Sequence, residues 1–258
     1  MGILNVTPDS FSDGGNYFSN KSAVSYGLEM IQEGVDIIDI GGESTRPGSD
    51  PVSLKEELER VIPVIEKILT EKEDAIISID TTKTKVAEEA LMAGAKIVND
   101  ISGGTFEPEI FYAAKEYDAG FIVMHIKGNP KTMQENPDYE DLIQEVYNFL
   151  EEQSCKARNA GIEKLFIDPG IGFGKSYIDN FKILNKLQEF NSLSFPITIG
   201  LSRKSFIGNS LNLNVNERDD ATNALNAFAV CKGARIIRTH NVKLGVQTCK
   251  IMNGILTI

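Results

Sequence analysis

The sequence predicts an α/β protein made of one domain, a (β/α)₈ barrel of the TIM type. Short apolar runs rich in β-branched residues recur along the chain, and a helical pattern follows each of them. The runs are almost continuously apolar, as expected for parallel strands that are covered on both faces. The length of 258 residues, of which 41% are hydrophobic, fits one barrel over residues 1–258 better than two smaller domains.

The apolar runs define the expected strands. An open doubly wound sheet is the alternative that the same alternation of strands and helices allows. The expected strands are Gly2–Val6, Val35–Ile40, Ala75–Asp80, Lys96–Asn99, Phe121–Met124, Leu165–Asp168, Ile197–Leu201 and Arg235–Arg238.

Helical patterns fill the remaining segments, and several of them stop before a glycine. Ser53 has capping-box spacing to Glu56, and Pro63 is expected to kink the helix that begins there. Two segments, Thr7–Asn20 and Gly41–Pro51, are expected to be long loops, which in compact barrels are often functional. The other expected helices are Ala23–Glu33, Lys85–Ala93, Glu109–Tyr117, Tyr139–Asn159, Ile178–Phe190, Ala221–Lys232 and Val242–Asn253.

The charge of the chain limits its partners. With 37 acidic and 26 basic residues, the formal net charge is −11, which argues against binding to nucleic acid or to anionic membranes. No apolar run reaches the roughly 20 residues that span a bilayer, and the N-terminus lacks the basic region of a signal peptide. We therefore expect a cytoplasmic protein.

The cysteines and histidines argue against a cysteine metal site and against a three-histidine zinc site. The 3 cysteines, Cys155, Cys231 and Cys249, are widely spaced and are expected to be buried reduced thiols. The 2 histidines, His125 and His240, are too few for a three-histidine zinc site within one chain.

Polar residues stand at or just after the end of every expected strand. In a (β/α)₈ barrel these ends meet at one face, where catalytic groups are found. Polar groups at all strand ends therefore predict a ligand site at that face. They are Asn5, Asp39, Glu43, Asp80, Asn99, Asp100, His125, Asp168, Ser202, Arg203, Lys204, Ser205, Arg238, Thr239 and His240.

Two of these loops contain long motifs. Asn5–Gly15 reads Asn-Val-Thr-Pro-Asp-Ser-Phe-Ser-Asp-Gly-Gly, and Asp39–Gly48 reads Asp-Ile-Gly-Gly-Glu-Ser-Thr-Arg-Pro-Gly. Both resemble signatures of the dihydropteroate synthase family, and the resemblance covers essentially the whole chain. The lead-in that the family usually has before the first strand is missing. The match continues through Asp80-Thr81, Val98–Asp100, Asp168–Lys175, Ser202–Ser205 and Arg238–His240.

The resemblance implies a transferase of folate biosynthesis. A dihydropterin that carries a methylene pyrophosphate reacts with para-aminobenzoate, pyrophosphate leaves, and dihydropteroate forms. The family also implies Mg²⁺, a homodimer and a target of sulfonamides.

Carboxylates and amides suit the pterin, whose flat edge presents amide and amino donors. Asp168 is expected to accept two of these hydrogen bonds, while Asp80 and Asn99 contact other ring nitrogens. Lys204 can donate to the ring, and Met124 can supply a soft apolar contact.

The leaving pyrophosphate requires cations and donors, because negative charge develops on it. Arg238 and His240 follow the last strand, where barrels often bind phosphate, and Thr45 is assigned to the same group. Asn5 is expected to offer its amide oxygen to a Mg²⁺ ion that bridges the phosphates.

The remaining predicted residues serve catalysis and the second substrate. We expect pyrophosphate to leave before the amine attacks, because the sequence offers no obvious nucleophile–base pair. Asp13, Arg46 and Lys204 are the predicted catalytic residues. The predicted aminobenzoate pocket consists of Phe11, Pro47, Phe173 and Ser205, with Arg46 beside it.

One other motif is rejected, and His125 is considered separately. Gly170–Ser176 resembles a phosphate-binding P-loop, but the spacing before Gly174-Lys175 is one residue short. His125 is interpreted as a hydrogen-bonded loop residue in preference to a second phosphate ligand.

Two alternatives to the synthase remain open. A methyltetrahydrofolate-binding methyltransferase shares the acid and amide contacts to the pterin, but it has no need of Phe11, Arg46, Arg238 or His240. A non-catalytic pterin-binding protein is the alternative from another functional class.

Overall fold

A computed structural model describes residues 1–7 and 15–257, and its strands form one parallel sheet in chain order. The prediction of eight strands is confirmed, although β1, β2, β3 and β7 are shorter than the apolar runs suggested. Their bounds are β1 Gly2–Asn5, β2 Ile38–Gly41, β3 Ile77–Asp80, β4 Ile97–Asp100, β5 Gly120–Met124, β6 Leu165–Asp168, β7 Ile197–Gly200 and β8 Ala234–Arg238.

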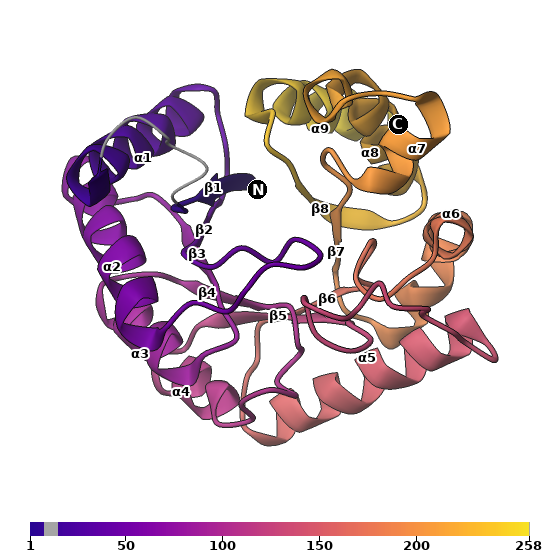
Figure 1. Ribbon diagram of the computed structural model, residues 1–258, viewed down its shortest axis with the longest axis horizontal. Helices are drawn as coiled ribbons and strands as arrows, with labels where there is room; N and C mark the ends of the chain where they lie inside the picture. The colour runs from indigo at the N-terminus through magenta and orange to yellow at the C-terminus, as the bar shows by residue number, and fades with distance from the viewer. Residues whose placement is uncertain (8–14, 258) are drawn as a thin grey trace.

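The sheet closes on itself between the first strand and the end of β8. Gly2 forms a parallel bridge with Thr239, the Ile3 N–H donates to the Thr239 carbonyl at 3.0 Å, and the Thr239 N–H donates to the Met1 carbonyl at 3.0 Å. Figure 1 shows the helices arranged around the strands. The doubly wound alternative is therefore wrong, because its sheet would stay open and its strand order would reverse.

The helices lie outside the strands. α1 begins at Gly15, so the expected loop Thr7–Asn20 is wrong from residue 15 onward, and α7 lies in a segment for which no helix was expected. The helices are α1 Gly15–Gln32, α2 Leu54–Glu71, α3 Thr84–Met92, α4 Ile110–Glu116, α5 Leu142–Asn159, α6 Tyr177–Lys186, α7 Ser205–Leu211, α8 Asp219–Cys231 and α9 Val242–Leu256, with 3₁₀ turns η2 Leu187–Leu193 and η3 Val215–Glu217.

The predicted start of α2 is only half confirmed. The Ser53 hydroxyl accepts the Glu56 N–H at 3.3 Å, as expected for an N-cap. The Glu56 carboxylate does not complete the capping box, because it pairs with Arg60 on the next turn. The helix continues on both sides of Pro63.

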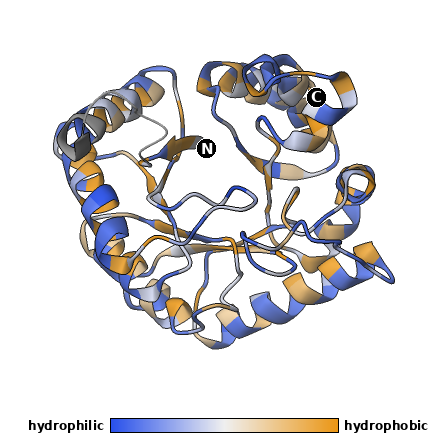
Figure 2. Ribbon diagram, viewed as in Figure 1, coloured by the Kyte–Doolittle hydropathy of each residue, from blue (hydrophilic) through white to orange (hydrophobic). Residues whose placement is uncertain are grey.

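The main core lies between the strands and the helices, and a smaller one fills the barrel interior. Figure 2 shows hydrophobic colours along the strands and mixed faces on the helices. Met1, Ile97 and Ile122 form a separate buried cluster, with Phe166 and Ile236 packed against it. This cluster closes the N-terminal end of the barrel, so polar strand ends meet only at the opposite mouth.

The cysteine prediction is partly wrong. All three thiols are free, but Cys155 and Cys231 are exposed and Cys249 is half-buried. They lie on α5, α8 and α9, and Cys249 packs against the main core. None of the helices in the described residues is long and apolar enough to cross a membrane.

Candidate active site

Four adjacent strands place their last inward-facing residues in one row. Asn5 pairs in register with Gly41, Gly41 with Asp80, and Asp80 with Asn99. Gly41 leaves space in this row, because an added Cβ would lie 3.4 Å from the Asp80 Cβ. The row lies at the carboxyl ends of the strands, where the sequence predicted the site.

Arg238 reaches across the mouth of the barrel to two acidic residues. Its Nε donates to Asp39 Oδ2 at 2.5 Å, and its Nη2 donates to Asp80 Oδ2 at 2.6 Å. Asn99 Nδ2 donates to the same Asp39 oxygen at 3.0 Å. We call Asp39, Asp80, Asn99 and Arg238 the acid–arginine cluster.

Burial strongly affects the charges of this cluster. It raises the pKa of Asp80 to about 7, although Arg238 opposes the shift. Burial alone would lower the pKa of Arg238, but Asp39 and Asp80 together raise it, so the guanidinium stays charged. A buried charge without a partner is costly, and this mutual pairing is what makes the cluster stable.

Asp168 ends β6 beside Met124, with which it pairs in register. Its Oδ1 accepts the Gly170 N–H at 2.7 Å. Burial raises the pKa of Asp168 to about 6 despite this bond and the nearby Lys204.

Lys204 lies between the aromatic and the charged parts of the mouth. Its Nζ is 4.1 Å from the centre of the Phe173 ring, a cation–π contact. Burial lowers the pKa of Lys204 to about 8, and its charge interacts with Asp168, Arg238 and Asp80. The structure thus brings the predicted pterin residues Asp80, Asn99, Asp168 and Lys204 into one site, together with Arg238.

Phe173 is buried, but not in the main core. It belongs to a small apolar cluster with Met124 and three other residues, Ile101, Ile126 and Met133. Its position beside Met124 and Lys204 places it at the same mouth.

His240 is held by its neighbours in a neutral form. Its backbone N–H donates to Ser202 Oγ at 3.1 Å, its Nδ1 lies 2.9 Å from the same oxygen, and its carbonyl accepts the Tyr26 hydroxyl at 2.9 Å. Burial first, and then the charges of Arg238, Arg203 and Arg46, lower the pKa of His240 to about 3.

The segment 42–53 between β2 and α2, the β2 loop, carries further predicted residues. Thr45 is half-buried, whereas Arg46 and Pro47 are exposed. Arg46 is near enough to His240 to lower its pKa, and the Gly48 N–H donates to the Pro130 carbonyl at 3.1 Å. The tip of the loop therefore lies toward the β5 and β8 ends of the mouth.

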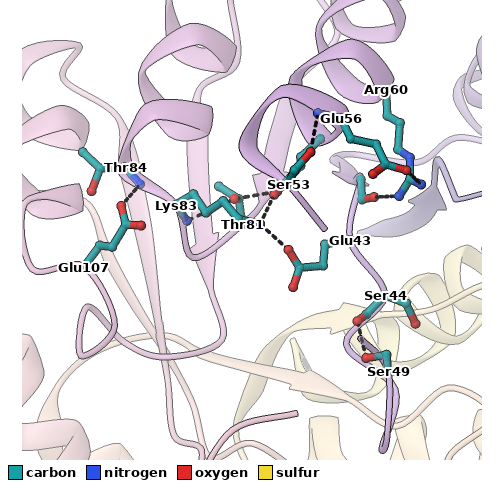
Figure 3. A network of polar contacts seen from close by, with 12 residues as sticks. Glu43, Ser44, Ser49, Ser53, Glu56, Arg60, Thr81, Lys83, Thr84 and Glu107 are labelled. Carbon is teal, nitrogen blue, oxygen red and sulfur yellow. Dashed lines mark hydrogen bonds and ion pairs between the residues drawn. The ribbon is translucent and has the colours of Figure 1, made fainter. Parts of the chain in front are cut away.

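Figure 3 shows how the base of the β2 loop is attached to α2 and α3. Lys83 donates to both Glu43 and Glu57, the Thr81 hydroxyl donates to Glu57 at 2.7 Å, and Arg60 Nη1 donates to the Gly42 carbonyl at 2.6 Å. Burial raises the pKa of Glu57. Burial alone would lower the pKa of Lys83, but its hydrogen bonds to the two glutamates raise it.

Lys175 and His125 form a second buried attachment. Lys175 Nζ lies 2.8 Å from His125 Nδ1 and donates to the Phe173 carbonyl at 3.0 Å. Burial lowers the pKa of His125 to about 2 and that of Lys175 well below its usual value. The interpretation of His125 as a hydrogen-bonded loop residue is confirmed, and Lys175 is a buried support of the loop that carries Phe173.

The other predicted site residues are less closely connected to the acid–arginine cluster. Ser205 is exposed and is the first residue of α7. Phe11 and Asp13 lie outside the described residues.

Sequence reasoning named Asp39 at a strand end without giving it a role, and it missed Glu57, Lys83 and Lys175. Asp39 is fully buried and joins three strands. A signal for Glu57 was present, since it stands four and seven positions before Val61 and Val64, on the face of α2 that is buried in the core.

Comparisons with known proteins agree with this geometry. Residues 1–240 match the family model of pterin binding enzymes. The chain is 50% identical to the dihydropteroate synthase of Synechocystis sp. over 258 residues, which cover 99% of this chain and 89% of that protein. The chain belongs to the dihydropteroate synthase family.

Two solved structures of dihydropteroate synthases have the same fold. The Yersinia pestis synthase with a sulfonamide drug complex has a TM-score of 0.93 and 41% identity, covering 100% of this chain and 94% of that one. The Xanthomonas albilineans synthase in complex with 7,8-dihydropteroate has a TM-score of 0.89 and 37% identity, covering 100% and 93%. This family membership favours the synthase over the methyltransferase alternative.

Proposed function

We propose that the chain condenses 6-hydroxymethyl-7,8-dihydropterin pyrophosphate with para-aminobenzoate, giving 7,8-dihydropteroate and pyrophosphate in folate biosynthesis. The observation that carries the proposal is that Asp168, Lys204 and the acid–arginine cluster share one mouth of the barrel. The Xanthomonas albilineans relative, solved with 7,8-dihydropteroate, supports the same chemistry.

The pterin is proposed to lie against the ends of β3 to β6. The Asp168 carboxylate would accept two hydrogen bonds from the amide and amino edge of the ring, and Asn99 and Asp80 would contact other ring nitrogens. Met124 lies beside Asp168 and would contact the ring face. The Lys204 ammonium would donate to the ring.

The pyrophosphate is proposed to lie near the end of β8. Arg238 uses Nε and one Nη2 hydrogen on the acids, so its Nη1 and the other Nη2 hydrogen can donate to phosphate oxygens. His240 is neutral, and a Ser202 hydroxyl that donates to Nδ1 leaves Nε2 protonated as a donor. Thr45 would add its hydroxyl from the β2 loop.

The donor set near Asn5 fits Mg²⁺ held mainly by the substrate. Within the described residues no three His, Cys, Asp or Glu side chains are grouped as a metal site. Asn5 offers one hard amide oxygen beside the acid–arginine cluster, and Mg²⁺ typically combines one or two protein oxygens with phosphate oxygens and water. When bound, the ion would neutralise charge that develops on the leaving pyrophosphate.

Catalysis is proposed to proceed by loss of pyrophosphate before the amine attacks. Asp13 would stabilise the cationic pterin methylene, while Arg46 and Lys204 act beside it. Phe11, Pro47 and Phe173 would enclose the aminobenzoate ring, and Ser205 would bind its carboxylate. Kinetic isotope effects that show strong bonding to the incoming nitrogen in the transition state would contradict this order of events.

A homodimer and a cytoplasmic location are part of the proposal. Exposed apolar side chains on α8 and α9 support an interface there: Phe228, Ile251, Ile255 and Leu256. Sedimentation equilibrium tests the dimer directly, and a monomer at micromolar concentration would reject it.

A coupling assay tests the function. Folded protein is incubated with the dihydropterin pyrophosphate and para-aminobenzoate, with and without Mg²⁺, and dihydropteroate is measured. We expect product that depends on Mg²⁺. Absence of product from folded protein rejects the synthase, and pterin binding without turnover supports the non-catalytic alternative.

A further inference from the structure

Arg203 has an unusual backbone conformation directly before Lys204. Its φ is +57°, in the left-handed region that non-glycine residues rarely adopt. Such a conformation is strained and persists only where the surrounding structure holds it. Its position between Ser202, which contacts His240, and Lys204 links it to both predicted substrate subsites.

Residues at the start of α8 bind the side chain of Arg203 and both of its backbone polar groups. The Asp219 carboxylate accepts hydrogen bonds from Nε at 2.7 Å and Nη2 at 2.8 Å. The Arg203 N–H donates to Thr222 Oγ1 at 3.2 Å, and the Arg203 carbonyl accepts a hydrogen bond from Arg218 Nη1 at 3.0 Å. The Arg203 side chain, its backbone N–H and its backbone carbonyl are therefore all held by residues 218–222.

Asp219 also reaches the loop that follows β8. Its Oδ2 accepts a hydrogen bond from Asn241 Nδ2 at 3.2 Å, and Asn241 follows His240 and caps α9. One carboxylate thus connects the residue before Lys204 with the residue after His240.

The pair stays charged at neutral pH. The hydrogen bond from Arg203 lowers the pKa of Asp219, and the same bond raises the pKa of Arg203. A bidentate arginine–carboxylate pair also fixes direction, which a single hydrogen bond does not.

We propose that Asp219 and Arg203 are positioning residues that hold the backbone at residue 203, so that Lys204 points toward Asp168 and His240 keeps its place. Neither residue touches substrate. The inference rests on the proposed synthase function and extends it to residues outside the pterin and pyrophosphate contacts.

Asp219→Asn is the main test, because it keeps the shape of the side chain but removes its charge and one acceptor. We expect kcat to fall about 10- to 100-fold, as for a displaced catalytic group, with the KM for aminobenzoate within about twofold of the wild type. The alkaline limb of the kcat/KM profile, which we assign to Lys204, should move. Arg203→Lys should give a smaller loss, since lysine keeps the charge but not the fork.

Asp220→Asn is the matched control, since Asp220 is an exposed acid in the same first turn of α8. It makes the same change of charge near the same helix end and should leave kcat and the pH profile unchanged. If Asp219→Asn lowers only the thermal unfolding midpoint and leaves the pH profile and kcat equal to those of Asp220→Asn, the positioning role is wrong.

Comparison of Arg203→Gly with Arg203→Ala separates the backbone from the side chain. Both lose the ion pair, but glycine tolerates the left-handed conformation. We expect glycine to retain more activity than alanine, and equal losses would contradict a role of the backbone at residue 203. If the wild type itself makes no product, the proposed function fails. Calorimetric pterin affinity and its pH dependence in the same variants would still decide the positioning role.

Discussion

The acid–arginine cluster and the β2 loop face the same mouth but are held in different ways. In the cluster, Arg238, Asp39 and Asp80 bond to one another at the ends of strands, and Asp39 is completely buried. In the β2 loop, the partly buried charged contacts lie at the base, around Lys83, whereas the tip at Arg46 and the ion pair of Asp50 with Lys131 are exposed.

The difference separates a rigid subsite from an adjustable one. The strand ends fix the groups proposed to bind the pterin before any substrate arrives, which is the arrangement that favours precise binding. Of the groups proposed for aminobenzoate, Pro47 lies on the β2 loop, with Arg46 beside it. This loop is held by charged contacts at its base and by exposed contacts of Gly48 and Asp50 with residues 130 and 131. Substitutions in the cluster should therefore cause large losses, and those in the loop should cause graded changes in turnover.

The largest expected effect is that of Arg238→Leu. This change leaves Asp39 and Asp80 buried without their cation, and breaking a buried pair typically costs about 3–5 kcal/mol. We expect a loss of that size in the free energy of unfolding measured in urea, together with loss of synthase activity. Arg235→Leu on the same strand is the control, because Arg235 is exposed. Equal stability of the two variants would show that the cluster is not a structural unit.

The next largest effect is expected for Asp168→Ala, which should weaken pterin binding by roughly 2–4 kcal/mol because it leaves donors of the ring without an acceptor. Calorimetry with the pterin substrate measures this change. Ser205→Ala, on the proposed aminobenzoate side, should leave the pterin affinity unchanged. A change below about 0.5 kcal/mol for Asp168→Ala would mean that the carboxylate does not contact the ring.

Most of the fold could be predicted because its signals are local. The apolar run Leu165–Asp168, for example, forms a strand with the same bounds. The helix ends were indicated by glycines, and the glycines that follow these helices have positive φ: Gly34, Gly94, Gly161 and Gly233. The helix α7 was missed because it has only 7 residues and contains Gly208. The early start of α1 was missed because Gly15 to Asn20 lack a clear apolar period.

The site residues could be predicted only where they stand at the ends of expected strands. Asn99 and Arg238 could be placed at the mouth from their positions in the chain, but their shared bond to Asp39 joins residues 60 and 199 positions apart. The same limit applies to Asp219, whose partner Arg203 is 16 residues away. Such contacts follow from closure of the barrel, which no short window of sequence contains.

The third prediction concerns pH. Burial raises the pKa of Asp168 to about 6 and lowers that of Lys204 to about 8. As pH falls through about 6, Asp168 gains a proton and loses its capacity to accept two hydrogen bonds. As pH rises through about 8, Lys204 loses its charge. We therefore expect kcat/KM for the pterin substrate to fall on both sides of this window.

Two measurements identify the groups that cause the acidic and alkaline limbs of the kcat/KM profile. They are the profile of Lys204→Arg and the binding of a pterin without phosphate. Arginine stays protonated, so the alkaline limb should disappear in Lys204→Arg while the acidic limb remains. Calorimetric binding of the 6-hydroxymethyl pterin, which carries no phosphate, should keep the acidic limb if Asp168 causes it. An alkaline limb that stays in place in Lys204→Arg would show that another group titrates there.

The smallest effect is expected for Glu43→Gln at the base of the β2 loop. The change removes one ion pair of Lys83 but leaves its pair with the buried Glu57, so the fold should keep its stability. The Glu43 pair is only partly buried and is worth at most about 1 kcal/mol, which corresponds to a roughly fivefold change. Because Glu43 precedes Arg46 and Pro47 in the loop, we expect this change in the KM for aminobenzoate, with pterin affinity unaltered.

The matched control for Glu43→Gln is Asp50→Asn, which breaks the exposed ion pair with Lys131 near the other end of the loop. Both side-chain partners there are largely exposed, so this pair should contribute almost nothing. If both variants change the KM for aminobenzoate equally, the contact of Glu43 at the base does not determine the position of the β2 loop. If Glu43→Gln lowers pterin affinity as much as it raises the KM for aminobenzoate, the two sides of the mouth are not separate subsites.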